Sequence, residues 1–136
     1  MRKLHLSLTG LAAVVALIVS VELLASPEVN PAFKIDTVSS ACMSEQHDLD
    51  IRAVGNSVVI TAPMQTPNPC YSIVGDVKFS GRDIEVDLSA ASKQEICIQC
   101  VGEVTGKVVI QNLTKGGYGV TVKTPDRAAI TTIMIE

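Results

Sequence analysis

The sequence predicts an all-β fold, a β-sandwich of about seven short strands that follows a hydrophobic N-terminal helix. Apolar and polar side chains alternate in most segments after residue 46, which is typical of half-buried strands. Turn signals that contain glycine separate several of these segments. Helical spacing of apolar residues is absent after residue 25, so the sequence offers no helical crossover for a parallel sheet. These observations favour a sandwich over a small barrel.

Residues 1–25 have the order of a secretory signal. Arg2 and Lys3 give a positive start, and an almost uncharged apolar run follows over residues 4–24. That run is also close to the roughly 20 residues that span a bilayer, so an uncleaved membrane anchor is the alternative interpretation. In both cases we expect the rest of the chain to lie outside the cytoplasm, secreted or anchored.

The rest of the chain divides into a lead-in and a domain. Residues 26–46 have no clear period, and we interpret them as a stalk or lead-in that can supply a first edge strand from residues 33–38. The β-sandwich itself is expected over residues 47–136. Its strands are expected around residues 49–53, 58–62, 73–79, 84–88, 104–110, 118–122 and 130–135.

Two turns are expected between neighbouring strands of this series. Ser80-Gly81-Arg82 suits a β-hairpin between residues 73–79 and 84–88. Lys78 on one strand and the acidic side chains of the other would then make opposite-charge pairs across the hairpin. Lys115-Gly116-Gly117 is expected to turn the chain between residues 104–110 and 118–122.

Composition excludes several classes of partner. After residue 25 the chain carries nine Lys and Arg residues against thirteen Asp and Glu residues. A mildly acidic domain has no basic stripe for phosphates, so nucleic acid is not an expected partner. Trp is absent and Phe and Tyr number two each, which argues against stacking platforms for sugars or bases. We expect no cofactor, and contact with a membrane only through residues 1–25.

The four cysteines are Cys42, Cys70, Cys97 and Cys100. An even number in a small exported chain predicts two disulfides. Sequence alone allows three connectivities. We expect Cys70 to pair with Cys100 and Cys42 with Cys97, while a Cys97–Cys100 bond stays possible if the chain turns tightly at Gln99.

The spacing Cys97-Ile98-Gln99-Cys100 has two functional alternatives. A thiol-redox pair would have its first cysteine at a helix N-terminus, which lowers the pKa of the thiol, but no helix is predicted after Cys100. A zinc site would combine the cysteines with His47, but the chain has one C-x-x-C spacing where two are usual. Structural disulfides are therefore the favoured interpretation.

Two resemblances to known proteins support this fold. Leu113-x-x-Gly116-x-Tyr118-x-Val120-x-Val122 resembles the penultimate-hairpin signature of immunoglobulin-like and fibronectin-type extracellular modules. That resemblance implies an immunoglobulin-like sandwich in which the Tyr118 hydroxyl binds a backbone group a few residues upstream. The segments Thr66-Pro67-Asn68-Pro69-Cys70-Tyr71, Cys97-x-Gln99-Cys100 and Gly-x-Tyr-x-Val together resemble small exported β-domains of archaea and bacteria whose function is uncharacterised. This second resemblance implies a compartment and a fold but no activity.

Two surface features are candidates for recognition. Pro67 and Pro69 restrict the backbone of the loop before Cys70, so Met64, Gln65, Pro67, Asn68 and Tyr71 form a possible recognition loop on a rigid scaffold. Asn112-Leu113-Thr114 fits the N-glycosylation pattern beside a predicted turn.

No catalytic constellation accompanies these features. His47 is the one histidine after the leader, and no G-x-S-x-G motif occurs. We therefore expect a non-enzymatic module that binds a protein partner or a cell-surface component. The alternatives are a thiol-redox or metal-binding protein that uses Cys97 and Cys100, and a structural subunit of a surface or membrane complex.

Overall fold

The computed structural model describes residues 30–93 and 95–136. The expected signal peptide or anchor of residues 1–25 lies outside these residues. Within them, no helix is long and apolar enough to cross a membrane.

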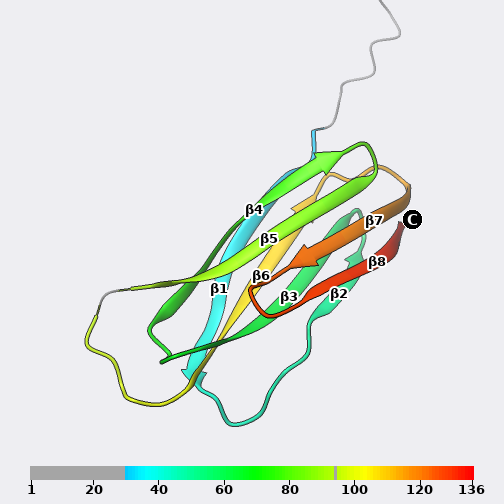
Figure 1. The fold of residues 1–136 in the computed structure, drawn as a ribbon. Coiled ribbons are helices and arrows are strands. Elements are labelled where there is room, and N and C mark those ends of the chain that lie inside the picture. Colours follow the sequence, from blue (N-terminus) through cyan, green and yellow to red (C-terminus); the bar gives the residue numbers. More distant parts are fainter. Residues whose placement is uncertain (1–29, 94) are drawn as a thin grey trace, which may run out of the picture.

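The described chain forms eight strands in two sheets of four, arranged as two layers (Figure 1). The expected all-β sandwich is therefore confirmed at the level of its architecture. In chain order the strands are β1 (Ala32–Cys42), β2 (Asp50–Val54), β3 (Ser57–Thr66), β4 (Tyr71–Ser80), β5 (Asp83–Ser92), β6 (Gly102–Gln111), β7 (Gly116–Lys123) and β8 (Ala128–Ile135).

The first sheet has the strand order β1-β6-β3-β2, and all its pairs are antiparallel. β1 pairs with β6 along its length, with a register shift between Thr37 and Ser39. The segment expected as a stalk or lead-in thus supplies a complete edge strand of the sandwich, so the domain begins well before residue 47. β2 and β3 form a hairpin whose turn includes Gly55, which has a positive φ of 59°.

The second sheet has the order β4-β5-β7-β8. The expected hairpin at Ser80-Gly81-Arg82 is present, with Lys78 opposite Glu85. Gly81 has a φ of 60°, a conformation that glycine adopts at little cost. β5 and β7 are parallel neighbours, because the chain leaves this sheet after β5, builds β6 in the other sheet and then returns.

This crossing corrects one expectation from the sequence. The turn expected at Lys115-Gly116-Gly117 does not join neighbouring strands, because Gly116 and Gly117 already belong to β7 and β6 lies in the other sheet. The strand order also differs from that of constant-type immunoglobulin domains, in which the first, second, fifth and fourth strands share one sheet. The likeness to those modules is therefore limited to the two-layer architecture and the tyrosine pattern.

Alternating side chains of both sheets meet in one core. β6 shows the pattern plainly, since Val104, Val108 and Ile110 are buried and Lys107 between them is exposed. Gly106 lets β6 pass close to β4, because a Cβ at this position would lie 2.8 Å from Ile73 Cγ2. The sheets also share a hydrogen bond, in which the Ile73 N–H donates to Thr37 Oγ1 at 2.8 Å.

Candidate functional site

Both disulfides lie at one end of the sandwich and meet the same loop. Cys42, the last residue of β1, is bonded to Cys100, and Cys70, just before β4, is bonded to Cys97. The prediction of two disulfides is confirmed, but the expected pairing of Cys70 with Cys100 and Cys42 with Cys97 is wrong. Cys100 lies close to the start of β6, whose partner β1 ends at Cys42, so the sheet brings these two residues together.

We call residues 93 and 95–101 the anchored loop. Cys97 and Cys100 fix it to two different places in the chain, and hydrogen bonds hold both of its ends. The Lys93 N–H donates to Cys70 O at 3.0 Å, and the Met43 N–H donates to Val101 O at 2.8 Å. The anchored loop is therefore positioned by four attachments to its neighbours.

The anchored loop exposes aliphatic side chains. Ile96 is fully exposed, Ile98 is 66% exposed and Val101 is 47% exposed. Met43, which is hydrogen-bonded to Val101, is also exposed. Isolated apolar residues on a surface are ordinary, but several on one covalently fixed loop are a candidate binding surface. Sequence reasoning missed them, although Ile96 and Ile98 flank Cys97 in an otherwise polar segment.

The expected recognition loop lies at the same end of the molecule and is tightly braced. Thr66 Oγ1 donates to Asn68 O at 2.7 Å, and the Cys70 N–H donates to Asn68 Oδ1 at 3.0 Å. Ser40 Oγ donates to Pro69 O. The start of β6 packs against this loop, since a Cβ on Gly102 would lie 2.4 Å from the carbonyl carbon of Asn68.

The residues expected in the recognition loop differ in how exposed they are. Gln65 and Pro67 are exposed, and Asn68 and Tyr71 are half-buried. Tyr71 packs against the core. Met64 does not belong to the surface, because it is 3% exposed and continues the inward row of β3. The exposed part of this loop is thus smaller than the sequence suggested.

His47 braces another segment of the same region. Its Nδ1 lies 2.6 Å from Glu103 Oε1, and its backbone N–H donates to Glu103 Oε2 at 3.3 Å. The Glu103 side chain is largely buried, whereas that of His47 is mostly exposed. His47 therefore connects the segment after β1 to β6. Cys97 and Cys100 have disulfide partners, and the zinc ligand set considered from the sequence is not assembled.

Tyr118 acts at the opposite end, where the chain crosses between sheets. Its ring is buried, and its hydroxyl accepts a hydrogen bond from the Thr114 N–H at 3.1 Å. The Thr114 hydroxyl lies 2.9 Å from the same oxygen. The backbone contact implied by the tyrosine pattern is thus present. Asn112 is exposed at the start of this crossing, with a φ of 62°.

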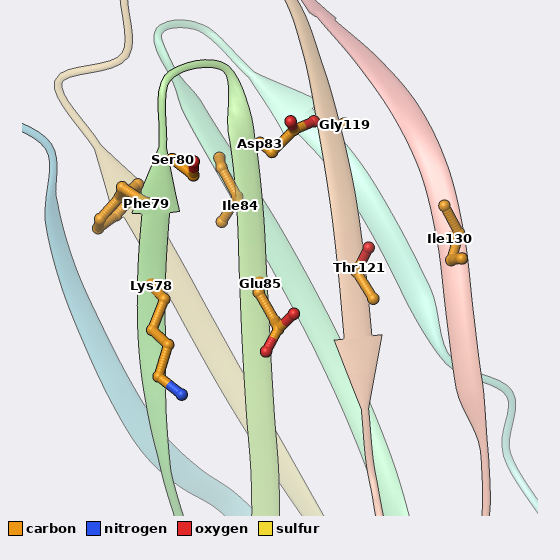
Figure 2. Close-up of a pocket in the computed structure, with 9 residues that line it drawn as sticks. All are labelled: Lys78, Phe79, Ser80, Asp83, Ile84, Glu85, Gly119, Thr121 and Ile130. Atoms are coloured by element: carbon orange, nitrogen blue, oxygen red, sulfur yellow. The ribbon is translucent and has the colours of Figure 1, made fainter.

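A shallow hollow lies on the outer face of the second sheet (Figure 2). Lys78, Glu85, Thr121 and Ile130 stand in one row, with one residue from each strand. Gly119 contributes no side chain, and a Cβ there would lie 2.7 Å from Asp83 Oδ1. Glu85 Oε2 pairs with Lys123 Nζ at 3.1 Å. The hollow is open and carries charges of both signs.

Comparison with known proteins adds no further assignment. No protein-family model, curated protein or solved structure matches this chain. Among residues 30–93 and 95–136, no three His, Cys, Asp or Glu side chains are grouped so that they could hold a metal ion. The anchored loop is therefore the candidate site that the geometry of the described residues favours.

Proposed function

We propose that this protein is a non-catalytic binding module that works outside the cytoplasm and contacts a protein partner through the anchored loop. The observation that carries the proposal is the exposure of Ile96, Ile98 and Val101 on a loop held by two disulfides. A loop fixed before binding loses less conformational entropy when a partner covers it. Exposed aliphatic side chains then gain from leaving water.

The same bonds support the proposed compartment. Two intramolecular disulfides indicate an oxidising environment, and the signal-like order of residues 1–25 supplies a route of export. Gln65 and Pro67 extend the proposed surface along the neighbouring braced loop. The acidic balance of the chain favours a protein over a nucleic acid as the partner.

The thiol-redox alternative has less support. A redox C-x-x-C forms its disulfide between its own two cysteines, whereas Cys97 and Cys100 are bonded to Cys70 and Cys42. His47, the one histidine after the leader, uses its Nδ1 and its backbone N–H to hold Glu103. These residues support the interpretation of this end of the molecule as a rigid scaffold.

The proposal can be tested by photo-crosslinking in the cells that produce the protein. A crosslinking amino acid at position 98 should capture one defined partner, and its affinity for the full chain can then be measured with purified proteins. We expect Ile96→Asp with Ile98→Asp to weaken binding at least about tenfold, because charged groups resist desolvation. Reduction of the disulfides should weaken binding as well.

Val54→Asp is the matched control. Val54 is an exposed aliphatic residue at 53% and lies in the β2–β3 hairpin, away from the anchored loop. The proposal predicts unchanged affinity for this variant. Equal binding by the parent and the Ile96/Ile98 double variant would contradict it, as would an enzymatic turnover that disappears in His47→Ala.

A further inference from the structure

The four edge strands of the sandwich differ in how they are protected. Natural sheets block pairing with other chains by means of bulges, short edges and charged side chains. β1 has a register shift after Thr37 and carries Lys34 and Asp36. β2 is five residues long and contains Asp50 and Arg52. β4 carries Asp76 and Lys78.

β8 has none of these protections. It is eight residues long, Ala128–Ile135, with the uncharged sequence AAITTIMI. It pairs with β7 in continuous register from Ala128 to Ile135. Its other side is the edge of the second sheet, where the N–H and C=O groups of alternate residues face outward. Ile130 and Met134 on this strand are 81% and 62% exposed.

These exposed residues are arranged symmetrically about Thr132. In an antiparallel pair, directly opposite residues place their side chains on the same face of the sheet. If Thr132 of two copies stood opposite each other, Ile130 of each copy would face Met134 of the other. A two-fold interface must be complementary to itself in this way. We propose that β8 pairs with β8 of a second copy of this chain. The second sheets of the two copies then form one continuous sheet of eight strands.

Neighbouring residues on the outer face fit this register. Met134 stands opposite Gly117 of β7, which has no side chain, and a Cβ there would lie 3.2 Å from the Met134 sulfur. Ala128 would face Glu136 of the second copy.

A cysteine at the symmetry axis tests the register. All four native cysteines are in disulfides, so Thr132→Cys introduces a single free thiol. Opposite residues in such a pair have Cβ atoms about 5 Å apart, close to the spacing of a disulfide. We expect mild oxidation of the full chain to give a covalent dimer. Ser89→Cys, exposed on the outer face of the central strand β5, should give none.

A charge at the axis tests the association itself. Thr132→Lys places two like charges opposite each other and should raise the dimer dissociation constant at least about tenfold in analytical ultracentrifugation. Val74→Lys, at an exposed apolar position of the other edge strand, should leave the constant unchanged. Circular dichroism confirms that each variant is folded. A monomeric parent at all concentrations, or a dimer unaffected by Thr132→Lys, would overturn the proposal.

Discussion

Tyr118 fastens the point at which the chain changes sheets. Its buried ring belongs to the core, while its hydroxyl binds the backbone and side chain of Thr114 in the connection before β7. The guanidinium carbon of Arg82 lies 5.1 Å from the centre of the same ring. One residue thus joins the core, the crossing and the β4–β5 hairpin.

Removal of the Tyr118 hydroxyl should therefore destabilise the fold. Tyr118→Phe keeps the ring and loses both hydrogen bonds to Thr114, so we expect the free energy of unfolding to fall by about 1–2 kcal/mol. Urea unfolding should show a lower midpoint with an unchanged slope. Tyr71→Phe is the control, because the Tyr71 hydroxyl makes no hydrogen bond within the described residues, and it should change the midpoint little.

At the same scale, the sequence contained a signal for the burial of Met64 but none for the exposure of Ile96. Val58, Ile60, Ala62 and Met64 share one parity, and the burial of β3 follows this parity to its end. A recognition role for Met64 conflicts with this pattern. Ile96 has no such signal, since a single apolar residue in a polar segment fits a core, a turn or a surface equally well. Its exposure depends on disulfides whose pairing spacing alone does not determine.

Among the elements, the β7–β8 hairpin has a turn that hydrogen bonds from Thr124 hold in place. The Thr124 N–H donates to Arg127 O at 2.8 Å, and Thr124 Oγ1 donates to Asp126 Oδ1 at 2.7 Å. The hydrogen bond from Thr124 lowers the pKa of the Asp126 carboxyl below its ordinary value of 3.8, and partial burial opposes this effect. The turn thus favours the ionised carboxylate.

This shift gives the hairpin a dependence on pH. Because the pKa of Asp126 is lower in the folded state, its contribution to stability is present above about pH 4 and disappears as the pH falls through the folded value. Asp126→Asn lacks this contribution. The difference in unfolding free energy between parent and Asn variant should therefore shrink between pH 6 and pH 2, as measured by urea titrations. A difference that stays constant over this range would contradict the assignment.

The elements also show where local patterns stop being informative. The hairpin at Ser80-Gly81-Arg82 was predictable because two alternating runs and a three-residue link determine it locally. The turn expected at residues 115–117 looked similar, yet β6 pairs with β1 and β3 and β7 pairs with β5 and β8. Alternation determines which face of a strand is buried, whereas the choice of neighbours depends on contacts distant in the sequence.

At the scale of the whole molecule, the two disulfides are nested. The Cys70–Cys97 bond closes a loop with a separation of 27 residues, which lies inside the separation of 58 between Cys42 and Cys100. When the Cys70–Cys97 bond is intact, about 31 of the residues between Cys42 and Cys100 lie outside the loop that it closes. The two bonds therefore restrict chain segments of similar length. The proposed binding surface and the proposed β8 interface occupy different parts of the sandwich (Figure 1).

The nested arrangement of the two disulfides leads to a prediction about the unfolding free energy. In the chain-entropy description, closing a loop of this length stabilises a fold by about 3.5 kcal/mol, with a weak dependence on length. Cys42→Ser with Cys100→Ser and Cys70→Ser with Cys97→Ser should therefore lower the unfolding free energy by similar amounts, despite separations of 58 and 27. Urea unfolding of the two oxidised double variants measures both losses. A loss more than about 2 kcal/mol larger for the outer bond would show that it also holds the folded state together through the attachment of β1.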